Sequence, residues 1–482
     1  MTRLSLRWLL PWIAMAAPPV PTTEDSPLAP AFYIVPLDTG ELEACYLRMT
    51  GARSLFAEAG KDNDHVLAEL WLQRALASHA RRARLLQDAA LLYLPALPSM
   101  SLFVDERDSA KVCPSGSLGD HLSRMRAAAV AARVAAAHTK RPMRGLIVAS
   151  GPYAMTALGR ALRALNRPSP AAVDRLRSRA AATGDATSRA LWVLANQENW
   201  GGGLETWPAR VAMPYAANAE LTRSASLTPD REASRPFSIM SVGQWSHGLR
   251  QNGSSGTPGG QLLRVALSSW ARLPRTHVSL LAGRSPLAPE AQALLDRHSA
   301  NDSAASLRVA PVAYAQLLRN ATFCVVPRGD TPTTRKLYDA LAAGCVPVIV
   351  SDPWTAAGSR LRPFPHAAAL SDWARFAIVV SEDELMRDGA TAGERVLATP
   401  ASELGALRRA GRRAARALLF GWGAPPNATE TKAPPSHERW DATAGTVYGD
   451  AASLLLREVC CERFKHRGAL QPCSTEVCRQ WK

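Results

Sequence analysis

Short apolar runs without internal alternation recur along the chain, and longer segments with helical periodicity separate them. Such runs are typical of parallel strands buried on both faces, and their alternation with helices predicts a parallel sheet covered by helices. In the first half, the expected strands are Ala31 to Val35, Ala89 to Leu94, Leu146 to Ala149 and Leu191 to Leu194. The expected helices are Asp64 to Ala80, Asp120 to His138, Ala154 to Asn166 and Ala171 to Ala182.

The second half repeats this alternation after a polar connection between Ala216 and Arg235. Its expected strands are Phe237 to Val242, His277 to Leu281, Phe323 to Val326, Val346 to Val350 and Phe376 to Val380. Its expected helices are Gln261 to Ala271, Val312 to Leu318, Pro332 to Ala343 and Pro400 to Phe420. This order predicts two doubly wound α/β domains facing a cleft, at 31–225 and 226–400, and a closing basic helix at 401–422. A helix after the second domain would be able to pack back on the first.

The segment from Thr322 to Asp352 predicts a complete strand–helix–strand unit. Thr331 is suited to an N-cap and Pro332 to the first helical position, where its missing N–H costs nothing. Gly344 then ends the helix, because glycine tolerates a left-handed cap. Open α/β sheets bind their ligands at the loop ends of such units, so this segment is the first place to look for a site.

The expected helix start, Thr331 to Thr334, would present free backbone N–H groups to an anion such as a diphosphate. Arg335 lies within the first turn, and its planar guanidinium suits phosphate oxygens. Asp339 follows four residues later on the same helix face, where a carboxylate accepts hydrogen bonds from ribose hydroxyls. The alternative is a surface pair at i,i+4, worth about 0.2–0.5 kcal/mol. Spacing alone leaves both interpretations open.

Composition and charge restrict the class of partner. The chain has 482 residues, of which 47% are hydrophobic and 20% charged, as expected for a globular protein of two or three domains. Lysine and arginine number 57 against 41 acidic residues, which gives a net charge of +16. A basic surface suits phosphorylated small molecules or acidic polysaccharide. The arginines are spread along many segments, so nucleic-acid binding is not expected.

The segment 1–30 is typical of a targeting signal followed by a Pro-rich linker. Arg3 and Arg7 precede an apolar run from Trp8 to Ala17. This run suits a signal peptide or a short signal anchor, and it falls short of the ~20 apolar residues of a spanning helix. A disordered tail is the alternative. Either kind of signal would send the body of the protein into the secretory lumen.

Sequons and cysteines agree with that route. Candidate N-glycosylation sites are Asn252, Asn301 and Asn427, whereas the sequon at Asn320 directly precedes a buried strand. The segment 423–482 is expected to form a Pro-rich loop and a Cys-rich tail. Its cysteines predict disulfides. A zinc site is the alternative, but the paired C-x-x-C units that are typical of such a site are missing. These cysteines are Cys460, Cys461, Cys473 and Cys478.

The sequence CVVPRGDTPTTRKLYDALAAGCVPVIVSD, from Cys324 to Asp352, resembles the signature of the exostosin-like glycosyltransferases, family 47 of the sugar transferases. Downstream, similar segments are Arg362 to Phe364, Asp372 to Phe376 and Leu407 to Phe420. Upstream, they are Phe237 to Gly243, Gly260 to Arg264 and, more loosely, Glu69 and Asp88 to Pro95. The resemblance therefore covers roughly 32–422.

This resemblance implies a GT-B fold, a nucleotide-sugar donor held by the second domain and an acceptor glycan held by the first. It implies transfer with inversion, without a cofactor or a metal site. Arg335 would contact the donor diphosphate and Asp339 the ribose. The other donor-binding residues implied are Arg328, Gly329, Thr333 and Thr334 in the donor loop, Gly243 opposite them, and Arg264 at a helix opening.

The residue that activates the acceptor is not identified by the resemblance. Many family members carry Arg-Asp-His before the strand at Leu191, and this chain has Thr187 to Ala190 instead. Inverting transfer needs a base, normally Asp, Glu or His, to take the acceptor proton. Weak candidates are His247, Glu198 and Asp64.

The sequence thus predicts an inverting glycosyltransferase of the Golgi lumen or Golgi membrane, with a type II anchor as one form. It would move a sugar from a nucleotide-sugar donor to a glycan or polysaccharide. Among such donors, a UDP-sugar is favoured. Homo- or hetero-oligomers with other glycosyltransferases are possible partners. The alternatives are a catalytically silent partner of another transferase and a basic glycan-binding protein.

Overall fold

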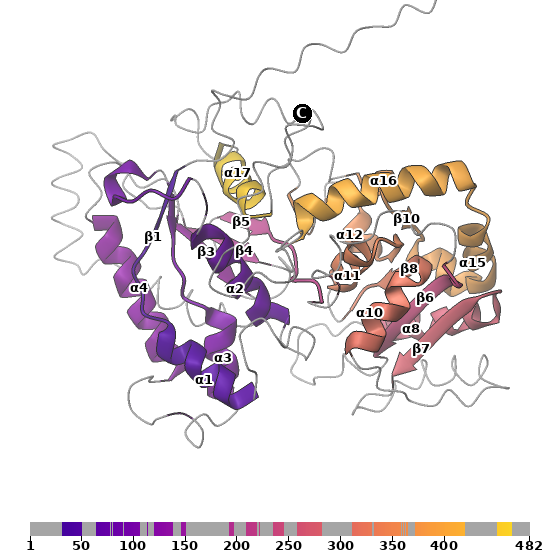
Figure 1. The fold of residues 1–482 in the computed structure, drawn as a ribbon, viewed down its shortest axis with the longest axis horizontal. Coiled ribbons are helices and arrows are strands. Elements are labelled where there is room, and N and C mark those ends of the chain that lie inside the picture. Colours follow the sequence, from indigo (N-terminus) through magenta and orange to yellow (C-terminus); the bar gives the residue numbers. More distant parts are fainter. Residues whose placement is uncertain are drawn as a thin grey trace, which may run out of the picture.

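Two parallel five-stranded sheets, one in each half of the chain, form the framework of the protein. The computed structural model describes residues 31–50, 64–106 apart from 78, 80 and 90, 113, 120–137, 146–150, 192–196, 209–221 apart from 219 and 220, 235–244, 258–281, 311–329, 332–364 apart from 358, 360 and 362, 372–419 and 451–464. Helices cover both sheets (Figure 1). The predicted α/β class, with two parallel sheets covered by helices, is confirmed.

The first sheet contains β1 (Phe32–Ile34), β2 (Leu91–Tyr93), β3 (Leu146–Ser150), β4 (Trp192–Asn196) and β5 (Ala209–Ala212). These strands lie in chain order, without the reversal of a doubly wound sheet. The described helices of this half are α1 (Gly40–Thr50), α2 (Asp64–Ala77), α3 (Pro98–Glu106) and α4 (His121–Ala137). α1, α3 and β5 are absent from the sequence prediction; they are short elements of 11, 9 and 4 residues.

The second sheet is doubly wound, as predicted. It contains β6 (Phe237–Gln244), β7 (Thr276–Leu281), β8 (Ala321–Pro327), β9 (Val346–Val350) and β10 (Ile378–Val379) in the order β10-β9-β8-β6-β7. Strand order therefore reverses between β8 and β6, and the carboxyl ends of these two strands form the switch point. Its helices are α8 (Pro258–Ala266), α10 (Pro311–Arg319), α11 (Lys336–Ala343), α12 (Asp352–Thr355), α14 (Glu382–Arg387), α15 (Gly389–Leu397) and α16 (Ala401–Leu418).

The helix of the strand–helix–strand unit begins later than predicted. α11 starts at Lys336, so Pro332 is not its first residue, and Thr331 lies outside the described residues. The Pro332 carbonyl accepts a hydrogen bond of 2.7 Å from the Ser351 hydroxyl, and the Lys336 N–H contacts the Thr334 hydroxyl at 3.4 Å. An additional helical turn would need the bond between Pro332 and Lys336 instead.

The predicted helix end at Gly344 is confirmed, and a side-chain cap starts another helix. Gly344 ends α11 in the left-handed conformation with φ of 69°, which suits glycine because it has no Cβ. Ser381 caps α14 by accepting a hydrogen bond of 3.0 Å from the Glu384 backbone N–H.

The basic helix α16 buries one side and exposes the other. Leu407 and Leu418 are buried, whereas Arg409, Arg412 and Arg413 are exposed. This distribution is that of an amphipathic helix lying on a core.

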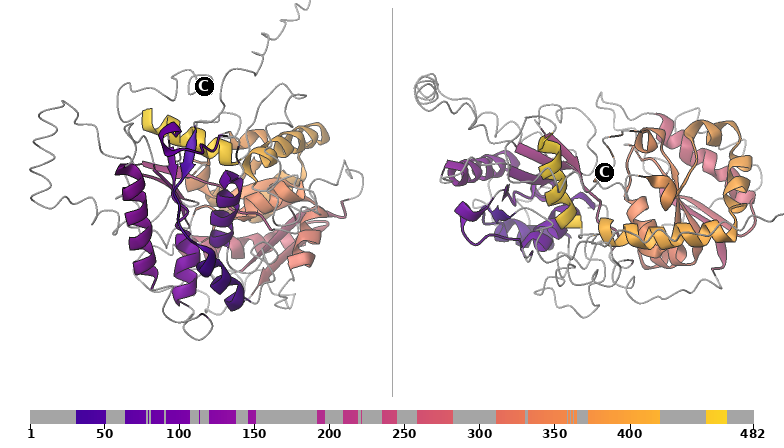
Figure 2. Two further views of the ribbon diagram at one scale, coloured as in Figure 1. Left: turned by 60° about the vertical axis from the view of Figure 1, so that its left-hand side comes forward. Right: turned by 90° about the horizontal axis from the view of Figure 1, so that it is seen from above.

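The segment expected to be a loop and a Cys-rich tail contains a helix, α17 (Ala451–Phe464). α17 packs on β5 and α2 of the first half and also contacts α16 (Figure 2). The His79 Nε2 atom lies 2.9 Å from the Ser453 hydroxyl of this helix. A helix after the second domain therefore does return to the first.

Two disulfides join cysteines that the sequence did not pair. Cys45 is bonded to Cys113, and Cys324 is bonded to Cys345. The side chains of the four C-terminal cysteines lie outside the described residues, so the disulfides expected there stay a prediction.

One apolar cluster extends through both halves of the chain. It includes Tyr93 and Val211 from the first half, Leu341 and Leu418 from the second, and Leu455 from α17. The predicted boundary at 225/226 falls between residues 221 and 235, outside the described residues, and stays a prediction. Among the helices that are described, we find none with the length and apolar character needed to cross a membrane.

Candidate functional site

The switch point of the second sheet brings two predicted site residues together. Gly243 lies at the end of β6, and Arg328 directly follows β8. The Arg328 backbone N–H donates to the Val350 carbonyl at 3.0 Å, and its guanidinium lies 3.2 Å from the Glu382 carboxylate. Burial raises the pKa of Glu382, although Arg328 acts against this shift. Arg328 is thus fixed at the mouth of the switch point by an ion pair.

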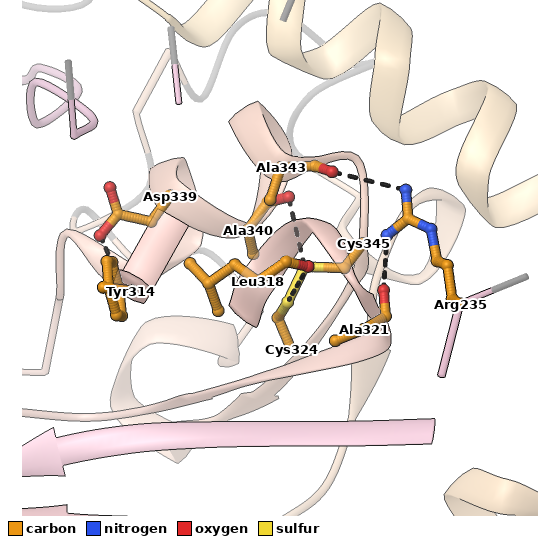
Figure 3. Close-up of a disulfide and its surroundings, with 9 residues drawn as sticks. All are labelled: Arg235, Tyr314, Leu318, Ala321, Cys324, Asp339, Ala340, Ala343 and Cys345. Carbon is orange, nitrogen blue, oxygen red and sulfur yellow. Dashed lines mark hydrogen bonds between the residues drawn. A yellow bond between two sulfur atoms is a disulfide. The ribbon is translucent and has the colours of Figure 1, made fainter. Parts of the chain in front are cut away.

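Arg335 and Asp339 form an ion pair that is unlike a surface pair. The Arg335 Nε atom lies 3.1 Å from Asp339 Oδ2, and the exposed fractions of the two side chains are 22% and 0%. The Tyr314 hydroxyl donates to the same oxygen at 2.9 Å (Figure 3). The Asn218 backbone N–H donates to the other oxygen at 2.8 Å. Asp339 therefore holds Arg335 in place from inside the protein.

This geometry changes the role that Asp339 is able to play. Both carboxylate oxygens already accept hydrogen bonds from protein groups, and the side chain is fully buried. A ribose hydroxyl would need to replace one of these donors. The predicted ribose contact is untested, and the observed contacts support a role in orienting Arg335.

Residues of the first half form one wall of the site. The Tyr215 hydroxyl lies 3.3 Å from the Thr333 hydroxyl, and the rings of Tyr215 and Tyr338 lie 5.8 Å apart. Thr333 is buried, so its side chain serves this contact between the halves. The segment that follows β5 therefore reaches the start of α11, a contact between distant parts of the chain that no local pattern predicts.

Lys336 is a further cationic residue at this site, and it was missed in the sequence. Its ammonium group donates a hydrogen bond to the Val242 carbonyl at the end of β6. Burial lowers the pKa of Lys336 to about 7. The positive charges of Arg264 and Arg335 also lower this pKa, whereas the negative charge of Asp339 raises it. The late start of α11 makes Lys336 its first residue, whereas the predicted start would place it a turn deeper.

Arg264 lies close enough to Lys336 to act on its charge, but its position in α8 differs from the prediction. It is in the last turn of that helix rather than at its opening, and it is buried. The helix begins at Pro258, earlier than the predicted Gln261, and its first residues Pro-Gly-Gly have low helix propensity.

The base of the site is held together by covalent and polar links (Figure 3). The disulfide between Cys324 and Cys345 joins β8 to the residue before β9. The Arg235 guanidinium donates to the carbonyls of Ala321 and Ala343, at the start of β8 and the end of α11. These links keep α11 fixed against the sheet that presents the switch point.

Glu69, which belongs to the looser upstream resemblance, has a structural contact in the first half. Its carboxylate is fully buried and accepts hydrogen bonds from the Ser99 backbone N–H at 2.9 and 3.1 Å. It thus caps the first turn of α3. Burial, followed by the charge of Glu69, raises the pKa of Tyr93.

The candidate bases are not placed by the structure. Glu198 and His247 lie outside the described residues, as do the sequons at Asn252, Asn301 and Asn427. Asp64 is the first residue of α2, and its side chain is not described. Gly329 lies in the loop after β8, next to Arg328.

Comparison with known proteins identifies the domain that contains this site. Residues 178–394 match the model of the Exostosin GT47 domain. An exostosin-1 homolog from Caenorhabditis elegans is 36% identical over 106 residues, which is 22% of this chain and 24% of that protein. Human exostosin-2 is 42% identical over 72 residues, 15% of this chain and 9% of that protein.

A plant protein is also similar to a short part of this chain. The probable xyloglucan galactosyltransferase GT12 of Arabidopsis thaliana is 31% identical over 93 residues, 19% of this chain and 17% of that protein. The chain thus spans about a quarter or less of the length of these curated relatives. The N-terminal domain of a Candida albicans trehalose-6-phosphate phosphatase covers 81% of this chain and 94% of its own, with a TM-score of 0.38 and 10% identity. That likeness is too low to carry an argument.

The matched region includes the switch point, Arg335, Lys336 and Asp339. Its strongest segment in the sequence, from Cys324 to Asp352, lies inside the match. Residues 178–394 of the chain, which contain the site, are therefore similar to the Exostosin GT47 domain.

Proposed function

We propose that the protein is an inverting glycosyltransferase that moves a sugar from a nucleotide sugar, a UDP-sugar above others, to a glycan or polysaccharide acceptor. The observation that supports this most is Arg335, held by the buried Asp339 at the switch point of an exostosin-like domain. Ligands of open α/β sheets bind outside the carboxyl ends of the strands at such a point.

The chemical task of this site is to stabilise the leaving nucleoside diphosphate. Charge develops on the diphosphate as the bond to the sugar breaks, and fixed positive groups lower the energy of that state. Arg335 and Arg264 supply guanidinium groups near the start of α11, whose N-terminus adds the positive end of a helix dipole. Because Asp339 fixes Arg335 before the donor binds, little reorganisation is needed during transfer.

The same proposal requires no metal ion, and it needs a base that the described residues do not identify. The acceptor hydroxyl must lose its proton to an Asp, Glu or His during attack at the anomeric carbon. His247, Glu198 and Asp64 remain the candidates. Transfer should be insensitive to EDTA, because the cationic side chains replace the metal that other transferases use to neutralise the diphosphate.

The location and partners that go with this function are those of the secretory pathway. The Golgi lumen or membrane would supply nucleotide-sugar donors and glycan acceptors, and the targeting signal and sequons of the sequence support such a route. Assembly with other glycosyltransferases is part of the proposal, because matched relatives include both exostosin-1 and exostosin-2.

The test is a panel of nucleotide sugars, measured by donor hydrolysis and by thermal stabilisation of the purified full chain. Arg335→Ala should abolish transfer to the acceptor while the fold is retained. The matched control is Arg387→Ala, because Arg387 and Asp383 form an exposed pair with the same i,i+4 spacing. Wild-type rates in Arg335→Ala, measured with an accepted donor, would refute the assignment.

A catalytically silent partner is the second candidate, and the unusual segment from Thr187 to Ala190 favours it. Such a protein would bind UDP and gain thermal stability, yet would transfer no sugar from any donor to any acceptor in the panel. Its activity would appear only as a gain in the rate or stability of a second transferase. A basic glycan-binding protein would show salt-sensitive polyanion binding with no response to nucleotides.

A further inference from the structure

A lysine at the start of α11 places its cationic group at the end of β6, and the donor site proposed above gives this group no role. Lys336 is the first residue of α11, and its ammonium group reaches across to the carbonyl of Val242. Val242 directly precedes Gly243 at the switch point. The side chain therefore brings a positive charge from the helix to the strand end where a ligand of this sheet would lie.

The described charges that act on Lys336 disfavour its ammonium form on balance. Among the described residues, they are Arg264 in α8, Arg335 directly before α11 and Asp339 in α11. Asp339, the one carboxylate among them, already accepts hydrogen bonds from Arg335, Tyr314 and the backbone of Asn218. Among the described charges that act on Lys336, the two guanidinium groups therefore oppose the ammonium form, and the one carboxylate also accepts hydrogen bonds from other groups. Like charges so close to one another in a partly dry site are unfavourable unless an anion joins them.

The ammonium group also has the capacity to bind a ligand. An ammonium carries three N–H donors, and within the described residues the Val242 carbonyl is its hydrogen-bond acceptor. Lys336 as a whole is partly exposed, although its charged end is enclosed by protein.

We propose that Lys336 is a third cationic contact for the diphosphate of the donor, beside Arg335 and Arg264, and that it takes up a proton when the diphosphate binds. This inference rests on the proposed donor site at the switch point. It assigns a role to a residue that the strand–helix–strand signature alone did not single out.

The proton is expected to come from solvent, for an electrostatic reason. Burial lowers the pKa of Lys336 to about 7, and the neighbouring Arg264 and Arg335 lower it as well. Above that pH the free protein therefore holds a neutral amine. A bound diphosphate places negative charge beside the nitrogen, which raises its pKa and favours the ammonium. Affinity should be full below about pH 7 and should fall as the pH rises above it.

The experiment measures UDP binding to the full chain by calorimetry at pH 6.5 and pH 8.0, for wild type, Lys336→Met and Lys336→Arg. A group with a pKa of about 7 in the free protein predicts that wild-type affinity falls about eightfold between these pH values. UDP itself titrates in this range, so Lys336→Met, which has no ionisable group here, supplies the reference profile. Lys336→Arg should keep its charge, and with it the affinity at pH 8.0.

A second measurement needs no variant. Wild-type binding heats at pH 8.0, compared in two buffers of different ionisation enthalpy, should show uptake of close to one proton per UDP beyond that of the nucleotide. Equal pH profiles for wild type and Lys336→Met, or binding without extra proton uptake, would overturn the role of Lys336 while leaving the donor site intact. Absence of UDP binding by wild type at both pH values would overturn the donor site and this inference together.

Discussion

Replacing Asp339 by asparagine tests whether the Arg335–Asp339 pair is part of the interior or an ordinary surface contact. The carboxylate accepts from Arg335 Nε at 3.1 Å, from the Tyr314 hydroxyl at 2.9 Å and from the Asn218 backbone at 2.8 Å. An amide has almost the same shape, but one of its two polar atoms is an NH₂ group. The amide therefore keeps one acceptor oxygen, and its NH₂ group would face protein groups that themselves donate hydrogen bonds.

The size of the effect follows from which contact is lost. An amide oxygen facing Asn218 keeps that bond, and the Tyr314 hydroxyl is able to rotate and accept from the new NH₂ group. The Arg335 contact has no such alternative, because guanidinium has no acceptor. A charge-assisted hydrogen bond contributes about 1.5–3 kcal/mol. Arg335 is 22% exposed and recovers some hydration, so we expect a loss of about 2–3 kcal/mol in the free energy of unfolding.

The assay is urea unfolding followed by tryptophan fluorescence, with Asp383→Asn as the matched control. Asp383 pairs with Arg387 at the same i,i+4 spacing, at 3.6 Å, and its side chain is 82% exposed. The control should change the free energy of unfolding by less than about 0.5 kcal/mol, because exposed pairs are screened. Equal, small effects of the two substitutions would refute the interior role of Asp339.

Two other predictions concern the links that hold α11 in place. Gly344→Ala should lower the free energy of unfolding by about 1 kcal/mol, because Gly344 has a φ of 69° that alanine adopts only with strain. Gly411→Ala in α16, where a Cβ would lie 3.8 Å from the Leu341 side chain, should instead raise it by about 0.5–1 kcal/mol. Replacing both Cys324 and Cys345 by alanine should cost about 3 kcal/mol, because the disulfide closes a loop of 21 residues. Urea midpoints measure both effects; a Gly344→Ala protein as stable as wild type, or a double variant with an unchanged midpoint, would contradict the respective expectation.

Elements that depend on local sequence were predictable, and the segment from Thr322 to Asp352 shows this best. Continuous apolar runs gave β8 and β9, and Gly344 gave the end of α11. The helix start was not predictable, because it depends on Ser351. Its hydroxyl binds the Pro332 carbonyl from 19 residues away, and no local signal reveals that contact.

The candidate site divides in the same way. The pairing of Arg335 with Asp339 followed from helical spacing, but the burial of Asp339 did not, because it comes from Tyr314 and Asn218 in distant parts of the chain. Lys336 was missed since a lysine beside an arginine usually marks a solvated helix face. Its contact with Val242 belongs to the tertiary fold.

Asp339 is also the point at which the two halves of the protein meet the proposed donor site. Its oxygens join α10 through Tyr314, α11 through Arg335 and the segment after β5 through Asn218. Thr333 adds a second contact to that segment through Tyr215. A rotation of one half against the other would have to break the bond between Asn218 and Asp339 or carry Asp339 with it. Because Asp339 also holds Arg335, the position of the first half and the orientation of the guanidinium are mechanically coupled.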